Sequence, residues 1–195
     1  SDDVARVETR LREDARIGIL VNNAGIAQTG RLVDQDPASI ERLIALNVTA
    51  VTRLASAVAP RFVQAGEGAI VNISSVVGLA PEFAMSVYGA TKAFVLFLSQ
   101  GLQVELAPSG VYVQAVLPAG TYTEIWERAG IDITHSTQFM DVGELVDAAL
   151  VGFDRREPVT IPPLRNAEHW QALDANRQAL IADINQAEAA ARYRA

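Results

Sequence analysis

Cysteine is absent from the 195-residue chain, so the sequence offers no disulfide framework and no thiolate for catalysis. Histidine is nearly absent as well. The only two histidines, His135 and His169, stand far apart without a partner at metal-ligand spacing, and no histidine-based metal site is expected. The lack of disulfide chemistry favours a reducing cytoplasm as the compartment of the protein.

Basic residues are outnumbered by acidic ones, 16 against 23, which gives a formal net charge of −7. This balance argues against nucleic acid or an anionic membrane as a partner. No apolar run approaches the ~20 residues of a membrane-spanning helix, and the N-terminus lacks the basic and apolar parts of a signal peptide. Half of the residues are hydrophobic, which suits one globular domain over residues 1–195 with a substantial core.

Amphipathic segments and short apolar runs alternate along the chain. Helices are predicted at residues 2–15, 38–64, 86–107 and 141–154, and buried strands at residues 17–21, 69–73, 111–117 and 158–161. A mobile segment that is irregular or forms a short helix is expected at residues 124–140, and a helical tail at residues 163–195. The alternation predicts an α/β fold, a doubly wound parallel sheet of the Rossmann-like kind.

Small polar side chains follow three of the predicted strands. They are Asn22 and Asn23, then Ser74 and Ser75, then Thr121 and Thr123. Plain turns also use such residues, but independent turns have no need to share this chemistry. Because ligands bind outside the carboxyl ends of strands in open α/β sheets, we expect one common cleft.

Tyr88 and Lys92 are four residues apart in a predicted helix, so their side chains lie on one face, one turn apart. Such a pair is most often a solvated helix face. The other interpretation is an acid–base pair, in which the lysine charge lowers the tyrosine pKa from its usual ~10 toward the working range. Ser75 would then bind the same substrate oxygen, and the pair would exchange a proton with a carbonyl or alcohol.

Together these motifs resemble the short-chain dehydrogenase/reductase family, from about residue 2 to about residue 161. Each match alone is weak, but their order and spacing favour the acid–base interpretation over the solvated face. The family's motifs are matched in sequence by Asn22-Asn23-Ala24-Gly25, Asn47, Ser75, Tyr88-x-x-x-Lys92 and Pro118 to Thr123.

The resemblance implies an NAD(P)-dependent oxidoreductase that interconverts a carbonyl and a secondary alcohol, with NADP or NAD as cofactor and no metal. Tyr88 is then the general acid and base, Ser75 binds the substrate oxygen, and Lys92 binds the nicotinamide ribose. Asn47, the fourth catalytic residue, supports a water that links Lys92 to solvent. The implied cofactor-binding residues are Asn23, Ala24, Gly25, Tyr88, Lys92, Pro118, Gly120, Thr121 and Thr123.

Two features depart from the family pattern. The glycine of its Pro-Gly pair stands one place later here, because Pro118 is followed by Ala119 and then Gly120. The Gly-rich dinucleotide turn that follows a first strand is absent, so an N-terminally truncated fold is expected. The chain is then a fragment of a longer product, a natural truncation, or a protein completed by another segment, and the start at a helix without Met favours the first. We expect this chain alone to bind NAD(P)H poorly.

Other functions have less support. A non-catalytic or cofactor-deficient binding or regulatory protein of the same fold rests only on the missing turn, and a serine hydrolase lacks G-x-S-x-G around Ser75. The helices at residues 38–64 and 86–107 are richer in apolar residues than one sheet face needs, so a homo-oligomer, a dimer or tetramer, is expected. An apolar pocket for a small carbonyl or alcohol substrate is indicated by Val76, Val77, Phe83, Met85 and Trp126.

Overall fold

The computed structural model of the chain describes residues 2–130, 132–133 and 138–194. The chain divides into two compact units, residues 1–163 and 164–195, and each unit is described by itself. Within the predicted irregular segment, residue 131 and residues 134–137, His135 among them, lie outside the described part of the chain.

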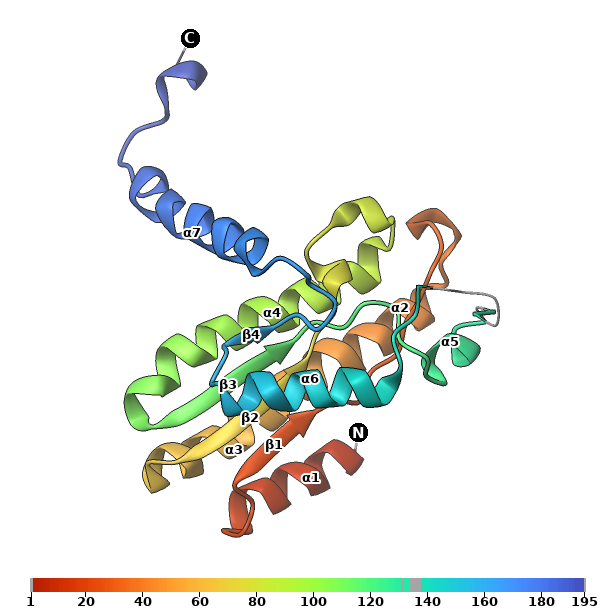
Figure 1. Cartoon of the computed structure of the whole chain (residues 1–195), viewed down its shortest axis with the longest axis vertical. Helices are drawn as coiled ribbons and strands as arrows, with labels where there is room; N and C mark the ends of the chain where they lie inside the picture. Colours follow the sequence, from red (N-terminus) through yellow and green to blue (C-terminus); the bar gives the residue numbers. More distant parts are fainter. Residues whose placement is uncertain (1, 131, 134–137, 195) are drawn as a thin grey trace. The chain divides into compact units, whose positions relative to one another are not determined.

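Unit 1 is built on a four-stranded sheet with the order β1-β2-β3-β4 (Figure 1). The strands are β1 (Ile19–Asn22), β2 (Gly68–Ile73), β3 (Val111–Val116) and β4 (Val159–Thr160). Each strand is parallel to its neighbour, which confirms the predicted parallel α/β sheet. The carboxyl ends of the strands therefore lie at one edge, where Asn22 of β1 pairs with Asn72 of β2.

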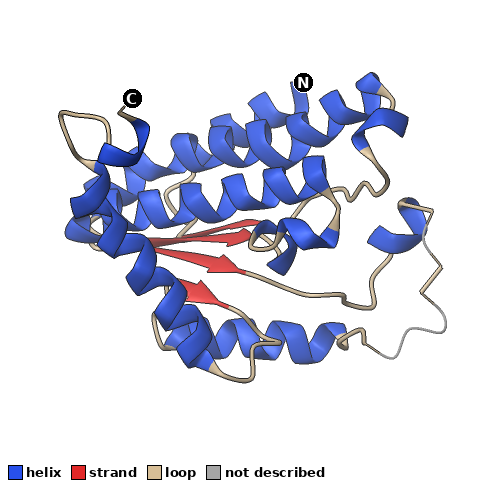
Figure 2. Ribbon diagram, turned by 90° about the horizontal axis from the view of Figure 1, so that it is seen from above, coloured by secondary structure: helices blue, strands red, loops and turns tan. Residues whose placement is uncertain are grey.

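Helices cover both faces of the sheet, as a doubly wound fold requires (Figure 2). α1 (Asp2–Glu13), α3 (Val51–Ala65) and α4 (Ser86–Leu106) lie on one face, and α6 (Val142–Asp154) lies on the other. Shorter helical elements lie in the connections between the strands and the longer helices. They are η1 (Leu32–Asp34), η3 (Val76–Gly78), η4 (Pro81–Phe83), η5 (Ala107–Ser109) and the single turn α5 (Ile125–Arg128).

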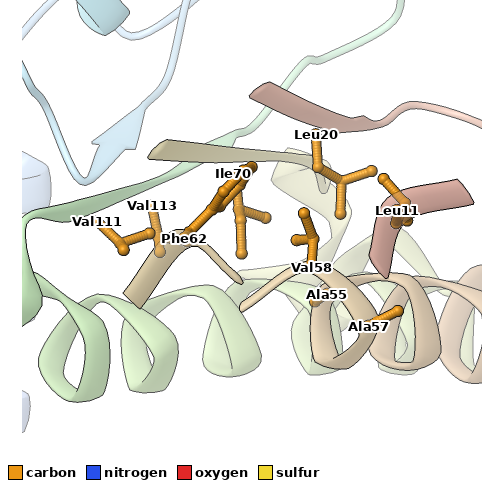
Figure 3. Close-up of a cluster of buried hydrophobic side chains, with 9 residues drawn as sticks. All are labelled: Leu11, Leu20, Ala55, Ala57, Val58, Phe62, Ile70, Val111 and Val113. Carbon is orange, nitrogen blue, oxygen red and sulfur yellow. The ribbon is translucent and has the colours of Figure 1, made fainter. Parts of the chain in front are cut away.

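The hydrophobic core fills the space between α3 and the strands. Val58 and Phe62 of α3 pack with Leu20 of β1 and Ile70 of β2 (Figure 3). Removing this apolar surface from water, at roughly 25 cal/mol per Å², is the main stabilising contribution. Gly68 permits the packing, because a Cβ at that position would stand 2.4 Å from the Phe62 ring.

The predicted helix at residues 38–64 is present, but its winding changes in the middle. α2 (Pro37–Ile44), whose cap Asp36 accepts a hydrogen bond from the Ser39 nitrogen, continues through a π-helical segment, η2 (Ala45–Ala50), into α3. A π-helical turn inserts one residue into the helical repeat and often marks a functional site. Here it carries Asn47, which is 2% exposed.

This continuous stretch, Pro37–Ala65, is long and apolar enough to cross a membrane by length and composition alone. The sequence nevertheless contains no unbroken apolar run of that length, and the expectation that no segment spans a membrane stays a prediction. Polar residues are spread through the helix, and they hide its average apolar character from a search for unbroken runs. Of its most apolar window, 39% is buried inside the protein, as befits a helix that packs on a sheet.

Unit 2 contains α7 (Ala167–Ile184) and the short turn η6 (Ala191–Tyr193). Asn166 caps α7 by accepting a hydrogen bond from the Glu168 nitrogen. The predicted helical tail is thus a helix, and none of its described residues is buried. The assignment of residues 1–195 to a single domain stays a prediction.

Candidate active site

Ser75 is held beside α4 by the segment that follows β2. The Ser74 hydroxyl donates to the Lys92 carbonyl oxygen at 2.7 Å, and the Ser75 hydroxyl donates to the Pro118 carbonyl oxygen at 3.1 Å. Gly78 lies against the backbone of α4, where a Cβ would stand 2.7 Å from a main-chain nitrogen. The segment is therefore fixed against the helix at the level of Lys92.

Tyr88 and Lys92 line the same cleft from the first turns of α4, and each is 7% exposed. The Lys92 ammonium donates to the Ile73 carbonyl oxygen at 3.0 Å, and Nζ lies 5.7 Å from the centre of the Tyr88 ring. Burial raises the pKa of Tyr88 to about 12, although hydrogen bonding with the Ser75 side chain acts to lower it. Burial lowers the pKa of Lys92 to about 8.

The expected lowering of the Tyr88 pKa by the Lys92 charge does not hold in this structure, because burial of the phenol raises the pKa and outweighs the opposing hydrogen bond with Ser75. The consequence concerns the direction of proton transfer. A phenol with a raised pKa stays protonated at neutral pH, and this is the form that can donate a proton to a carbonyl oxygen.

The oxygen and the nitrogen of the Asn47 side chain both form hydrogen bonds with protein groups. Its Oδ1 accepts from the Ile26 nitrogen at 3.0 Å, and its Nδ2 donates to the Ile26 oxygen at 2.9 Å and to Thr91 Oγ1 at 3.2 Å. The Thr91 hydroxyl in turn donates to the Tyr88 carbonyl oxygen at 2.7 Å. Asn47 therefore positions the turn after β1 relative to the first turns of α4.

Gly25, in that turn, lies between two polar groups of the site. A Cβ at Gly25 would stand 3.3 Å from Asn47 Oδ1 and 3.6 Å from Lys92 Nζ. The contact with Asn47 is tighter than ordinary van der Waals contact, so the protein itself favours a residue without a side chain here.

A second set of hydrogen bonds fixes the end of β1. Asn22 Nδ2 donates to Asn72 Oδ1 at 2.8 Å, and Asn72 Nδ2 donates to Ser99 Oγ at 2.9 Å. Ser99 Oγ donates to the Val95 carbonyl oxygen within α4. All three side chains are buried, so the network ties β1 and β2 to the helix that carries Tyr88.

Ser75, Tyr88 and Lys92 border one cavity of about 470 Å³ at the carboxyl ends of β1, β2 and β3. Asn47 and Ala24 are not among its described lining residues, and Asn47 acts from behind through Ile26 and Thr91. Of the predicted site residues, the cavity brings together Asn23, Gly25, Ser75, Tyr88, Lys92, Pro118, Gly120, Thr121 and Thr123.

Two apolar walls complete the cavity. The wall between β2 and α4 consists of Val76, Val77, Phe83 and Met85, and the wall after β3 consists of Ile125, Trp126, Phe139 and Leu145. The sequence predicts the first wall and Trp126. The sequence also marks Ser74 as a polar residue after a strand. No local pattern marks Phe139, Leu145 or Thr91 as site residues, because their places depend on contacts between distant segments.

Comparison with known proteins gives consistent matches. A family model described as short chain dehydrogenase matches residues 2–133. A solved short-chain dehydrogenase from Sphingobium yanoikuyae, in complex with NADPH, is 72% identical with a TM-score of 0.96, and the match covers 99% of this chain and 75% of that chain. The bulky-bulky ketone specific alcohol dehydrogenase from Comamonas testosteroni is 61% identical with a TM-score of 0.91, over 99% of this chain and 74% of that one.

Among curated proteins, the very-long-chain 3-oxoacyl-CoA reductase of Rattus norvegicus is 40% identical over 114 residues, which make up 56% of this chain and 36% of that protein. A 3-alpha-(or 20-beta)-hydroxysteroid dehydrogenase of Mycobacterium bovis is 36% identical over 129 residues, 66% of this chain and 50% of that protein. The chain thus spans about a third to a half of the length of the curated relatives it matches.

Proposed function

The chain belongs to the short-chain dehydrogenase family, and from this premise we propose that it carries the acid–base centre of an NADP(H)-dependent oxidoreductase that interconverts a carbonyl and a secondary alcohol. One observation carries the proposal. The Tyr88 phenol and the Lys92 ammonium are buried in the same cavity as the Ser75 hydroxyl, at the carboxyl ends of parallel strands.

Each of these groups has a distinct task. Tyr88 donates its proton to the carbonyl oxygen during reduction and accepts it from the alcohol during oxidation. The single Ser75 hydroxyl proton, which the Pro118 carbonyl oxygen accepts in this structure, turns to the same substrate oxygen and stabilises the charge that develops there. Protonated Lys92 stabilises the phenolate that Tyr88 becomes, and its pKa of about 8 lets it exchange a proton near neutral pH. The bound nicotinamide supplies the hydride.

The described residues fit the nicotinamide end of such a cofactor. Gly25 presents backbone without a side chain to the cavity, and Lys92 places a hydrogen-bond donor inside it. NADP rather than NAD is supported by the NADPH bound to the Sphingobium yanoikuyae enzyme. We assign the cofactor to Asn23, Ala24, Gly25, Tyr88, Lys92, Pro118, Gly120, Thr121 and Thr123.

The substrate is a ketone, or the corresponding alcohol, with a large apolar group on each side of the reacting carbon. Two apolar walls from different segments support this class, because each can pack against one substituent. The name of the Comamonas testosteroni enzyme, which specifies bulky-bulky ketones, supports the same class.

The complete gene product that contains this chain tests the proposal. It is supplied with NADPH and benzophenone, and turnover is followed by the loss of NADPH absorbance. Tyr88→Phe removes the proton donor, so kcat should fall by about 10²–10⁴-fold, while NADPH binding measured by fluorescence titration stays nearly unchanged. Tyr112→Phe is the matched control, because the Tyr112 phenol donates to the Glu157 carbonyl oxygen and does not line the cavity. Undiminished turnover by Tyr88→Phe would refute the proposal.

A homo-oligomer, a dimer or tetramer, is also proposed, with α4 at the interface. Phe97 and Val104 stand seven residues apart on one face of α4 and are 76% and 78% exposed. Light scattering on the complete gene product should show an oligomer that Phe97→Lys dissociates. A wild-type monomer contradicts the assignment.

A cytoplasmic location without nucleic-acid or membrane partners completes the proposal. The absence of cysteine and the net charge of −7 support it. Fractionation of cells that express the complete gene product should leave it in the supernatant after the membranes are pelleted, and recovery with the membranes contradicts this location.

A further inference from the structure

The two ends of the segment that follows β3 are hydrogen-bonded to each other. Thr121 and Met140 form an isolated parallel bridge. The Tyr122 nitrogen donates to the Met140 oxygen at 3.0 Å, and the Met140 nitrogen donates to the Gly120 oxygen at 2.9 Å. Phe139, next to Met140, is thereby brought against residues 120–122, although it is distant from them in the sequence.

The Phe139 ring is confined on several sides. A Cβ at Gly120 would stand 3.1 Å from the ring, so the ring lies directly on the glycine backbone. The ring centroid is 5.2 Å from that of Trp126 in an edge arrangement and 5.6 Å from that of Tyr122. Trp126 is fixed in turn, since its Nε1 donates to the Thr121 carbonyl oxygen at 2.8 Å. Phe139 and Trp126 both line the cavity.

We propose that Phe139, held in place by Gly120, determines which substrates the cavity accepts. Its ring forms a fixed aromatic wall on which an aryl or large alicyclic substituent of the ketone packs. This inference rests on the proposed function and refines its substrate class. A ring already confined by the protein loses little freedom when a ligand packs on it, and this strengthens binding. The placement of glycine at Gly120, one residue later than in the family pattern, then has a physical reason, because Gly120 is where the ring lies.

The test compares benzophenone with acetone as substrates of the complete gene product. The measured quantity is the ratio of the two kcat/KM values, which cancels any effect on cofactor binding common to both ketones. Phe139→Ala should lower this ratio by about tenfold, since an aromatic contact with the substituent is lost. Phe139→Leu keeps the segment filled with an apolar side chain and should lower the ratio by about threefold, which keeps the test valid if Phe139→Ala does not fold.

Gly120→Ala tests the contact between Gly120 and the Phe139 ring from the side of the glycine. Its new methyl group would push the Phe139 ring by a few tenths of an ångström, so the ratio should fall again by about threefold. Gly101→Ala is the matched control, because a Cβ at Gly101 meets nothing within 4 Å and Gly101 does not line the cavity. An unchanged ratio in both Phe139→Leu and Gly120→Ala overturns the inference.

A binding measurement separates this inference from the proposed function. Trp126 and Trp170 are the two tryptophans of the chain. Trp170→Phe, together with phenylalanine at any tryptophan that the complete gene product has outside this chain, leaves Trp126 as the fluorescent residue. Quenching of the remaining fluorescence by benzophenone should be weaker by about tenfold in Phe139→Ala, even in a preparation without turnover. Suppose that the enzyme turns over but that substitution of Phe139 or Gly120 changes neither the ratio of the kcat/KM values nor the fluorescence quenching. The proposed function then stands, and the role of Phe139 is refuted. If quenching depends on Phe139 but no turnover is observed, the role of Phe139 in binding stands and the proposed function is refuted.

Discussion

Asn47 Nδ2 lies 3.2 Å from Thr91 Oγ1, and this contact joins the π-helical segment η2 to the first turns of α4. Both hydrogen-bonding functions of the Thr91 hydroxyl are used, since it also donates to the Tyr88 carbonyl oxygen. Asn47 also bonds the backbone nitrogen and the backbone oxygen of Ile26. The turn at Ile26 is thus connected through Asn47 and Thr91 to Tyr88, the residue proposed to transfer the proton.

Thr91→Val keeps the shape of the side chain and removes its hydroxyl. Asn47 Nδ2 then loses one partner at a position that is 3% exposed, so the free energy of unfolding should fall by about 1–2 kcal/mol. Because the first turn of α4 loses its anchor, kcat should fall more than KM rises. Thr91→Ser retains the hydroxyl and should restore kcat. Equal kinetics of the valine and serine variants in steady-state assays would contradict a positioning role.

Gly78→Ala should disturb the contact between η3 and α4. A Cβ at Gly78 would meet backbone atoms of Lys92 and Ala93 at 2.8 and 2.7 Å, and backbone cannot move aside cheaply. We expect a loss of about 1–3 kcal/mol in unfolding free energy, measured by urea denaturation. Gly101→Ala, within α4 and free of contacts, should instead gain up to about 1 kcal/mol. Equal stability of Gly78→Ala and Gly101→Ala would show that η3 does not pack closely against α4.

The sequence suffices to predict the parallel α/β sheet and the shared location of Ser75, Tyr88 and Lys92, because strand periodicity and the ends of parallel strands determine both. It does not reveal the π-helical segment at Asn47, since one inserted residue leaves the apolar pattern nearly intact. The upward shift of the Tyr88 pKa was also unforeseen. It depends on how much protein covers the phenol, and burial follows from packing rather than from the spacing of two side chains.

The roles of residues that act through distant contacts were missed for the same reason. Ser74 stands next to Ser75 in the sequence, yet only the fold shows that it holds the Lys92 carbonyl. Phe139 reaches the cavity because Met140 pairs with Gly120 and Tyr122. A sequence pattern indicates which groups carry the chemistry, whereas the groups that hold them in position come from contacts between separate segments.

The buried charge of Lys92 should lower the free energy of unfolding, although the proposed reaction needs this side chain. Its pKa is lowered from 10.5 to about 8 by burial, so below pH 8 the native state holds a charge that is poorly solvated. Lys92→Met, similar in shape and uncharged, should raise the unfolding free energy at pH 7 by about 1–3 kcal/mol, with loss of turnover. Part of the gain is offset because the Ile73 carbonyl oxygen loses its donor.

The pH dependence of this gain has a definite sign. Between about pH 8 and pH 10.5 the unfolded chain holds the Lys92 proton and the native chain does not, so wild-type stability from this group rises with pH across that window. The advantage of Lys92→Met should therefore shrink as pH increases from 8 to 10.5. Urea denaturation at several pH values measures the difference, and a difference that is constant with pH contradicts the assigned cause.

Asn72 should be the most costly of the buried polar side chains to truncate, because it is completely buried and bonded on both sides. Asn72→Ala removes the acceptor of Asn22 Nδ2 and the donor to Ser99, and it leaves a cavity. We expect a loss of about 3 kcal/mol or more in unfolding free energy. Asn176→Ala, at an exposed position of α7, should change stability by no more than about 0.5 kcal/mol.

The double replacement of Asn22 and Asn72 by valine separates two causes of destabilisation. One is the loss of the hydrogen bond between these side chains, and the other is the change in their shape. Ser99 still donates to the Val95 carbonyl oxygen, so no buried donor of the network is left without an acceptor. The double variant should therefore be more stable than the sum of the two single valine variants implies, by about 1–2 kcal/mol. Strictly additive losses would mean that Asn22 and Asn72 act independently.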